Sequence, residues 1–237
     1  MIINADAKGL EWVGGTYLSQ DKVAFDEIWA GVDQHTLNQE AFGLPSRLIA
    51  KTFVFRLMYG GSAYSYANDT NFTDVSNKEK FWQEVIDAFY NKYKGMAQWH
   101  KAIIKEAVMN KQLVMPTGRI CRFELKPNWR GDLVAPETII KNYPVQGLGA
   151  DIMSVIRVEF AKLFKKEKVK GVLINTVHDS IVCDTESSEL QLVNDLFLDV
   201  FKRGPELFEK RFHVKFNLPL QCEVGYGNNM KELTTLE

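Results

Sequence analysis

The sequence predicts an α+β fold in which a sheet carries a large helical insertion. Short β-rich runs stand near both ends of the chain, at residues 2–6 and 218–224, and a third β-rich segment covers residues 170–183. Helical patterns fill most of residues 12–135. No stretch rich in Pro, Gly and Ser separates these parts, so we expect the insertion to be a lobe on a sheet platform.

The chain is expected to begin with a strand and to continue with short helices. The apolar run at residues 2–6 ends in Asp6 and is typical of a strand whose partners lie elsewhere in the sequence. Residues 11–43 show helical patterns, and we expect a break at Gly14-Gly15. The residues Asp-Gln-His-Thr at 33–36 then precede a longer helix.

The segment Ser46–Gly61 is predicted to form one helix with an unusual stripe. Its residues Arg47, Lys51, Phe55 and Tyr59 are spaced by four, so they drift by only about 40° per step around the helix. The cationic residues come first, where the helix end already carries partial positive charge, which is unfavourable unless an anion binds there. A phosphate chain, with a flat ring stacked on the aromatic residues, would explain this order. An ordinary amphipathic helix with its basic residues in solvent explains the helix alone equally well.

The rest of the chain alternates between helical and extended patterns. We expect a long helical segment at 81–110, then a hairpin at 113–123 with its turn at 116–118, and a loop at 127–136. A helix from about 145 to 166 and a second hairpin at 170–183 follow. The chain then continues with helices at 187–212, interrupted at Gly204-Pro205, and a last strand at 218–224 before the turn-rich residues 225–229. The hairpin at 170–183 carries Asp179 at its tip.

Composition excludes several classes of protein. The chain has 237 residues, 46% of them hydrophobic and 25% charged, which are ordinary values for a globular protein. Its 29 basic and 30 acidic residues give a net charge of −1, so any surface that binds nucleic acid must be a local patch. Three cysteines with no CxxC pair indicate free thiols in a reducing compartment. No signal peptide or membrane span is recognisable, so we expect a cytoplasmic protein without membrane contact.

Two acids stand out because of where they lie in the predicted sheet. Asp6 and Asp179 each end or interrupt a β-rich segment, and each alone would usually be a turn or cap residue. On adjacent strands, two carboxylates can hold two divalent cations roughly 3.5–4 Å apart. Mg²⁺ suits such a site because it combines few carboxylates with substrate phosphates. Together with the cationic helix, the pair indicates phosphoryl or nucleotidyl transfer.

Five ordered stretches resemble a known family. The stretches A-D-A-K-G-L-E at 5–11, R-x3-K-x3-F-x3-Y-G at 47–60 and V-H-D-S at 177–180 resemble motifs A, B and C of the family A (DNA polymerase I-like) DNA polymerases. The stretches N-Y-P-V-Q-G-L-G-A-D-I at 142–152 and L-P-L-Q-C-E-V-G-Y-G-N-N at 218–229 are similar to two further parts of that family. The second stretch matches every defining position and is the most specific. The short first stretch resembles phage-type members more than bacterial ones.

The resemblance implies a particular architecture. Residues 1–11 and 136–237 would form the palm, an antiparallel sheet flanked by helices, and residues 12–135 would form the helical fingers. The thumb and 3′–5′ exonuclease of the family precede the first motif, and we expect both to be absent. The chain would then be a fragment, or one half of a polymerase split between two chains, with a separate N-terminal chain supplying the thumb. Its partners would be primer–template DNA and a deoxynucleoside triphosphate.

The resemblance also implies roles for individual residues. Asp6, Asp179 and the carbonyl of Ala7 would hold two Mg²⁺ ions, for which Mn²⁺ can substitute. Six residues are expected to bind the nucleotide. Glu11 would act as a steric gate against ribose, His35, Arg47 and Lys51 would bind the phosphates, and Lys51 would also protonate the pyrophosphate. Phe55 would pack on the sugar, and Tyr59 would lie at the insertion site. The residues expected to contact DNA are Asn142, Gln146 and His178. For His35, a helix cap or surface histidine is the alternative interpretation.

Three positions depart from the family pattern, and two other functions remain open. Ser180 replaces the usual Glu of motif C, Arg56 stands where many members have Gly, and Thr138 falls where an Arg often contacts the primer. A catalytically silent polymerase-like subunit would have lost the acids and Lys51, which are intact here. A two-metal phosphohydrolase would not need the aromatic half of the stripe, and it would cleave triphosphates without a primer.

Overall fold

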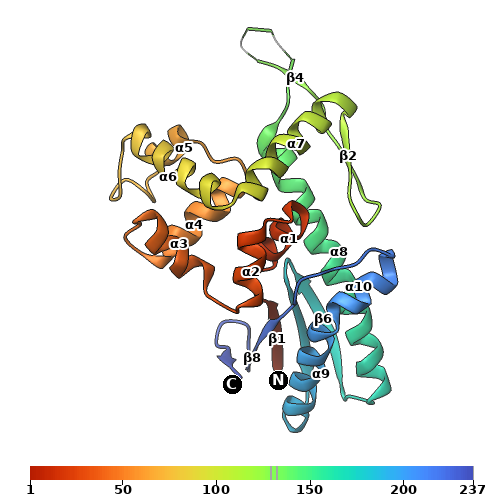
Figure 1. Ribbon diagram of the computed structural model, residues 1–237. Helices are drawn as coiled ribbons and strands as arrows, with labels where there is room; N and C mark the ends of the chain where they lie inside the picture. Colours follow the sequence, from red (N-terminus) through yellow and green to blue (C-terminus); the bar gives the residue numbers. More distant parts are fainter. Residues whose placement is uncertain (129, 132, 237) are drawn as a thin grey trace. The chain divides into compact units, whose positions relative to one another are not determined.

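The chain separates into two compact units, which are described here one at a time. The computed structural model describes residues 1–128, 130–131 and 133–236. The sheet unit comprises Met1–Val13 and the chain from Gly147 onward, and the helical unit comprises Gly14–Gln146. Figure 1 labels all α-helices and some of the strands of both units. Helix α1 (Leu10–Ser19) and helix α8 (Glu137–Lys166) each contribute residues to both.

The sheet unit is built on one antiparallel sheet of five strands in the order β6-β7-β1-β8-β9. The strands are β1 (Ile2–Ala7), β6 (Gly171–Val177), β7 (Ser180–Thr185), β8 (Cys222–Gly227) and β9 (Thr234–Thr235). The N-terminal strand therefore lies in the middle of the sheet, between strands that come about 180 and 220 residues later. This confirms the expected α+β fold and its antiparallel sheet.

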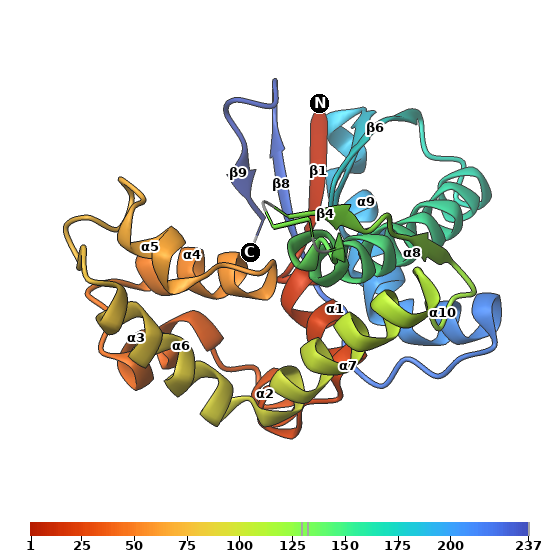
Figure 2. The same cartoon turned by 90° about the horizontal axis from the view of Figure 1, so that it is seen from above.

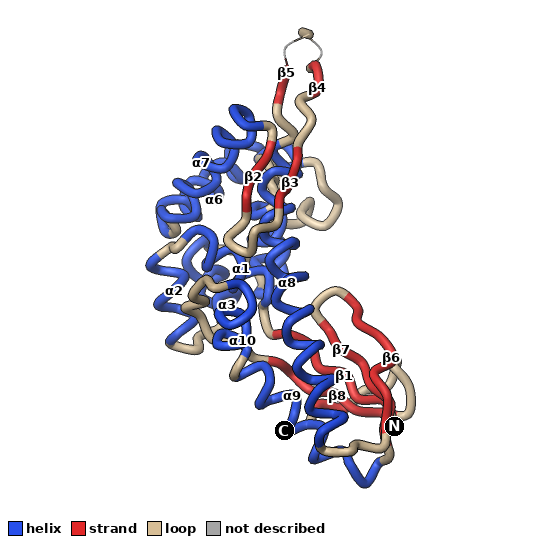
Figure 3. Tube along the Cα trace, turned by 90° about the vertical axis from the view of Figure 1, so that its right-hand side faces the viewer, coloured by secondary structure: helices blue, strands red, loops and turns tan. Residues whose placement is uncertain are grey.

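One face of this sheet is buried under helices. Along β1, Ile3 and Ala5 are fully buried, and they pair with Cys183 and Ile181 of β7, which are buried as well. Helices α9 (Leu190–Lys202) and α10 (Gly204–Phe212) follow β7 in the chain. Figure 3 shows the C-terminal half of α8 and helix α9 running beside the strands. The rings of Phe160 on α8 and Phe197 on α9 stack with centroids 3.7 Å apart, so burial fixes which face of each strand points outward.

The helical unit packs around a cluster of aromatic side chains. Its helices are α2 (Lys22–Trp29), α3 (Gln34–Phe42), α4 (Arg47–Met58), α5 (Ala63–Ala67), α6 (Glu79–Lys92) and α7 (Lys94–Asn110). The rings of Phe53, Tyr66, Phe72 and Trp82 are all fully buried and contact one another. Figure 2 shows helices α3, α4, α5 and α6 close together. Each ring buries roughly 150–250 Å², so this cluster holds α4 in place.

Helix α4 matches its prediction at both ends. The side chain of Ser46 accepts a hydrogen bond from the amide of Ile49, which caps the N-terminus. At the other end Gly60 adopts φ +87°, a conformation that suits glycine and ends the helix. A side chain at Gly60 would also lie about 3.0 Å from Thr138 of α8. The helix therefore starts and stops for the reasons read from its sequence.

Two expected helix boundaries are wrong. Helix α1 continues through Gly14-Gly15, because a side chain at Gly15 would lie 2.4 Å from the Cε of Met58. That glycine allows α1 to approach α4 closely instead of breaking the helix. Helix α8 begins at Glu137, ahead of Pro144, and not at about residue 145. An internal proline costs about 3 kcal/mol, which burial of several apolar side chains along α8 offsets.

Smaller differences affect the extended segments. The hairpin at 113–123 is confirmed as β2 (Gln112–Val114) and β3 (Ile120–Arg122). The segment expected to be a loop at 127–136 contains a second, very short hairpin of β4 (Lys126–Pro127) and β5 (Leu133–Val134); positions 129 and 132 of that segment lie outside the described residues. The last long strand begins at Cys222, four residues later than expected. None of the described helices is long and apolar enough to cross a membrane.

Candidate functional site

The structure brings the two predicted acids onto neighbouring strand ends in the sheet unit. Asp6 is the penultimate residue of β1 and pairs in register with Ser180, the first residue of β7. Asp179 immediately precedes Ser180, in the tight turn between β6 and β7. The amide of Ala7 donates a hydrogen bond to the carbonyl of Asp179 at 2.9 Å. Backbone pairing therefore places the two acidic residues at the ends of neighbouring strands.

The strand register also shows on which face of the sheet the side chain of Asp6 lies. Residues that pair directly in antiparallel strands share a face, so Asp6, Ser180 and Glu223 of β8 lie on one face. This is the face opposite to the buried Ile3 and Ala5, and Asp6 is exposed on it. The hydroxyl of Ser180 donates to the carbonyl of Val177 at 3.0 Å, so the motif C serine closes the hairpin turn.

The donor set at this edge fits a magnesium site that is completed by substrate. Asp6, Asp179 and the main-chain carbonyl of Ala7 offer only hard oxygen ligands, the kind that Mg²⁺ prefers. Among the residues that the structure describes, no group of three or more His, Cys, Asp or Glu side chains could enclose a metal ion. A site with two carboxylates leaves coordination positions for phosphate oxygens, as expected of an ion that bridges protein and nucleotide.

The thiols near this edge are inert. All three cysteines are buried, and two of them, Cys183 and Cys222, lie in the sheet unit. Burial raises the pKa of Cys183 and of Cys222 to about 12, and the carboxylate of Asp6 adds to the effect at Cys222. These thiols stay protonated at neutral pH and supply neither a nucleophile nor a metal ligand.

Glu11 and His178 flank the acids in the chain. Glu11 lies in the first turn of α1, five residues after Asp6, and is half-buried. His178 is exposed at the hairpin tip beside Asp179, and its φ of +51° is a left-handed conformation that β-hairpin turns require. The steric-gate role of Glu11 and the DNA contact of His178 stay predictions.

In the helical unit, the predicted stripe lies on the open face of α4. Arg47 and Lys51 are exposed and Phe55 and Tyr59 are half-buried. The opposite face of the helix holds Ala50, Phe53, Val54, Leu57 and Met58, all buried. The Nζ of Lys51 lies 5.9 Å from the centroid of the Phe55 ring. The stripe is therefore a continuous cationic and aromatic surface.

Asp33 holds Arg47, the first residue of this stripe. No motif in the sequence marked Asp33 as functional. Its Oδ2 accepts a hydrogen bond from the Nε of Arg47 at 2.5 Å. Its Oδ1 accepts from the amide of His35 at 3.0 Å and so caps helix α3. The bond from Arg47 is the main reason why the pKa of Asp33 falls to about 2. The pattern Asp-x-His-Thr was the available signal, since an Asp two residues before a helical His is a standard cap.

His35 is neither the helix cap nor a surface residue. Its side chain is buried, with 6% of the residue exposed, and its ring packs edge-on against Phe55 with centroids 5.4 Å apart. Burial, with help from the charges of Arg47 and Lys51, lowers the pKa of His35 to about 4. At neutral pH the ring is uncharged, so it could meet a phosphate only as a hydrogen-bond donor and not as a cation.

The end of the stripe meets the start of helix α8. The Nε2 of Gln146 donates a hydrogen bond to the hydroxyl of Tyr59 at 2.8 Å. Asn142 lies one helical turn before Gln146 on the same side of α8, and Thr138 lies one turn earlier and contacts Gly60. Thus three of the residues discussed for DNA contact share one face of α8 next to the end of α4. Their contact with DNA stays a prediction.

Arg56, a departure from the family pattern, has a structural partner. It forms an ion pair with Asp69. Its guanidinium also lies over the buried rings of Tyr66 and Phe72, 5.3 and 5.8 Å from their centroids. The large charged side chain thus joins α4 to the aromatic core of the helical unit.

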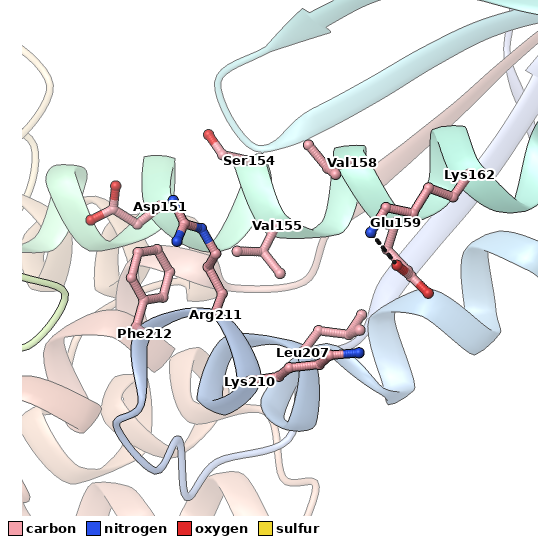
Figure 4. A pocket seen from close by; sticks show the side chains of 10 residues that line it. All are labelled: Asp151, Ser154, Val155, Val158, Glu159, Lys162, Leu207, Lys210, Arg211 and Phe212. Carbon is pink, nitrogen blue, oxygen red and sulfur yellow. Dashed lines mark hydrogen bonds and ion pairs between the residues drawn. The ribbon is translucent and has the colours of Figure 1, made fainter.

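A separate hollow exists in the sheet unit and contains none of the predicted site residues. It lies between α8 and α10, has a volume of about 520 Å³ and is bordered by both charged and apolar side chains (Figure 4). Lys162 and Glu159 form an ion pair at 3.3 Å across one turn of α8. The guanidinium of Arg211 lies 5.7 Å from the ring centroid of Phe212. The side chains that line this hollow carry charges of both signs, and they do not favour any one class of ligand.

Comparison with known proteins points to one family. The model of DNA polymerase family A matches residues 1–232. DNA polymerase I of Mycobacterium tuberculosis (strain ATCC 25618 / H37Rv) is 24% identical over 244 residues, which cover 96% of this chain and 25% of that protein. DNA polymerase I of Geobacillus stearothermophilus is 25% identical over 240 residues, again 96% of this chain and 25% of that protein. The chain spans about a quarter of the length of these relatives.

A solved structure agrees in fold. The polymerase domain of Pol1 from M. smegmatis, in complex with DNA primer–template and dNTP, superposes with a TM-score of 0.76 at 21% sequence identity. The match covers 95% of this chain and 39% of that one. The same α+β arrangement is therefore present in both proteins.

Proposed function

This chain belongs to DNA polymerase family A, and we propose that it catalyses template-directed transfer of a deoxynucleotide to a primer 3′-hydroxyl. The observation that carries the proposal is the pairing of Asp6 with Ser180, which sets Asp6 and Asp179 at neighbouring strand ends. The cationic and aromatic stripe on the open face of α4 supports it. The proposed substrates are primer–template DNA and a deoxynucleoside triphosphate.

In this proposal the acids act as metal ligands. Asp6, Asp179 and the carbonyl of Ala7 would hold two Mg²⁺ ions, or Mn²⁺ in their place. Bound metal would lower the pKa of the attacking hydroxyl and neutralise charge on the departing pyrophosphate. Ser180 is not needed as a ligand, because its hydroxyl is used within the hairpin turn.

Side chains of α3 and α4 would bind the nucleotide and assist the departure of pyrophosphate. Arg47, Lys51 and the neutral ring of His35 would bind the triphosphate, and Lys51 would donate a proton to pyrophosphate as it leaves. Phe55 would pack on the sugar and Tyr59 would lie beside the template base. Glu11 would fill the space that a ribose 2′-hydroxyl requires.

Three residues are proposed to contact DNA. Gln146 would touch the minor groove of the primer end, where hydrogen-bond acceptors are common to all correct base pairs. His178 and Asn142 would contact the same region. The proposed setting is DNA replication of the viral or phage type, in the cytoplasm of a host cell. A separate N-terminal chain would supply the thumb. The thumb matters because it would add contacts to DNA phosphates, and such contacts give most of the affinity for DNA.

Primer extension tests the proposal directly. The chain is incubated with labelled primer–template, Mg²⁺ and the four dNTPs, alone and together with a candidate N-terminal polymerase chain, and product length is read on a gel. We expect templated extension, strengthened by the N-terminal chain. Hydrolysis of dNTP without a primer would favour the phosphohydrolase alternative. No extension under either condition would favour the silent subunit.

A further inference from the structure

Asp33 joins the two segments that carry the proposed triphosphate ligands. Its carboxylate accepts three hydrogen bonds, from the amide of His35 at 3.0 Å, the hydroxyl of Thr36 at 3.1 Å and the Nε of Arg47 at 2.5 Å. Two of these donors lie in the first turn of α3 and the third is the first residue of α4. A single side chain therefore fixes the start of one helix against the start of the next.

The way in which Arg47 is held leaves its binding end available. The bond to Asp33 uses the Nε–H, and a guanidinium has four further N–H groups on its two terminal nitrogens. Those terminal groups form the fork that grips phosphate oxygens in pairs. An exposed arginine otherwise samples many rotamers, and ordering such a side chain on binding costs roughly 0.5–1.5 kcal/mol. Anchoring through Nε removes part of that cost in advance.

The environment of His35 indicates where its proton lies. Its Nδ1 is fully buried and has no hydrogen-bond partner among the described residues. A buried N–H without an acceptor is less tolerable than a buried lone pair. The neutral ring therefore carries its proton on Nε2, which leaves Nε2–H as the donor for an anion. The cap that Asp33 provides holds the backbone of this residue.

We propose that Asp33 is a positioning residue of the triphosphate site, which orients Arg47 through Nε and fixes the first turn of α3 that carries His35. The inference rests on the proposed function, because it takes the triphosphate as the ligand of this surface. Asp33 itself does not touch the phosphates. Its negative charge is already matched by Arg47, so it directs the guanidinium without cancelling the attraction of Lys51.

The experiment compares Asp33 with Asp69, a second acid that forms an ion pair with an arginine of α4. Asp33→Asn and Asp33→Ser keep a side chain able to cap α3 but remove the charge that holds Arg47. Asp69→Asn is the matched control, since it breaks the other arginine pair of α4, that of Arg56. Binding of inorganic triphosphate to the full chain is measured by calorimetry, with the melting temperature as a check on folding. We expect both Asp33 variants to bind about 5- to 10-fold more weakly and the control to bind as wild type.

A double-mutant cycle shows whether the effect passes through Arg47. In the Arg47→Gln background, Asp33→Asn should have no further effect on triphosphate binding. An equal loss in both backgrounds would overturn the inference, as would unchanged or tighter binding by Asp33→Asn, or a wild-type chain that does not bind triphosphate. In primer extension, Asp33→Asn should raise the KM for dNTP and leave kcat within about twofold.

These readouts separate the two proposals. Triphosphate binding needs neither primer nor template, so an Asp33 effect that depends on Arg47 supports the inference even if the chain does not extend a primer. Extension by the wild type with unchanged triphosphate binding by Asp33→Asn would leave the proposed function intact and overturn the role of Asp33.

Discussion

The acids of the sheet unit and the stripe of the helical unit are held by different means. Asp6 and Asp179 owe their positions to backbone pairing between β1 and β7, whose register is fixed by the buried face of the sheet. Arg47 and His35 owe theirs to side-chain contacts with Asp33 and Phe55. Positions that are fixed by backbone hydrogen bonds should survive the loss of a side chain. Positions that are fixed by side-chain contacts should change when either contacting side chain is replaced. Each of the following experiments tests this difference.

The largest effect is expected at the backbone-held acids. Asp179→Ala should reduce primer extension by about 10³-fold or more, because a metal ligand that stabilises developing charge is worth several kcal/mol. The melting temperature should barely change, since the amide of Ala7 bonds to the backbone carbonyl of Asp179. The measurement is the extension rate with thermal unfolding in parallel. Asp184→Ala, at the far end of the strand β7 that follows Asp179, is the control. Full activity of Asp179→Ala would rule out its role as a metal ligand.

A smaller loss is expected in the stripe. Lys51→Ala should lower kcat by about 10²-fold through loss of a general acid, with little change in affinity for DNA. Single-turnover extension and a DNA-binding titration measure the two quantities. Lys80→Ala removes an exposed lysine from the first turn of α6 and serves as the control. A loss of DNA affinity that exceeds the loss of rate would show that Lys51 only positions phosphate.

A selective effect is expected at the gate. Glu11→Ala should leave extension with dNTP nearly unchanged and reduce the preference for dNTP over rNTP by about 10²-fold, because the space for a 2′-hydroxyl is then open. Competition between the two nucleotides in one extension assay measures the preference. Glu40→Ala, an exposed acid on α3, should leave the preference unchanged. If sugar selection survives Glu11→Ala, the gate lies elsewhere.

The smallest effect concerns stability and pH in the helical unit. Burial lowers the pKa of His35 to about 4 and that of His100 to about 3, against an ordinary value of 6.5. Between about pH 6.5 and pH 4 the unfolded chain therefore binds more protons, so the free energy of unfolding falls as the pH drops through this window. Each histidine should account for on the order of 1–3 kcal/mol.

Denaturant unfolding at a series of pH values checks this expectation. His35→Gln should weaken the pH dependence of the free energy of unfolding by roughly the contribution of one histidine. His213→Asn, which replaces an exposed histidine at a left-handed position, is the matched control. A pH profile that His35→Gln does not alter would mean that folding does not lower the pKa of this ring.

The sequence predicted most of the elements because local signals and packing agree there. The helix at 47–58 has a serine cap and a glycine stop, and the hairpin around Asp179 has strong β-formers on both sides of a polar turn. Prediction failed where tertiary contact decides. Gly15 marks a close approach to Met58 and not a break, and α8 runs through Pro144 because its neighbours are buried. No local pattern carries that information.

The same distinction applies to the site. Residues that match a motif could be named from the sequence, and the structure places Arg47 and Lys51 on the exposed face of α4 with Phe55 and Tyr59 half-buried. The ion pairs of Arg47 with Asp33 and of Arg56 with Asp69 could not be named, since each acid lies thirteen or fourteen residues from its arginine across a turn. Such partners depend on how two helices pack. The burial of His35 was missed for the same reason.

The three buried thiols give the protein a built-in set of reporters. Cys121 lies in β3, Cys183 in β7 and Cys222 in β8, so each marks a different strand. A protonated, enclosed sulfur reacts with an alkylating reagent only when its strand opens. The labelling rate at each position, read by mass spectrometry, would thus measure how often that strand separates, without any engineered probe. Cys183, beside the central strand β1, should be the slowest to label.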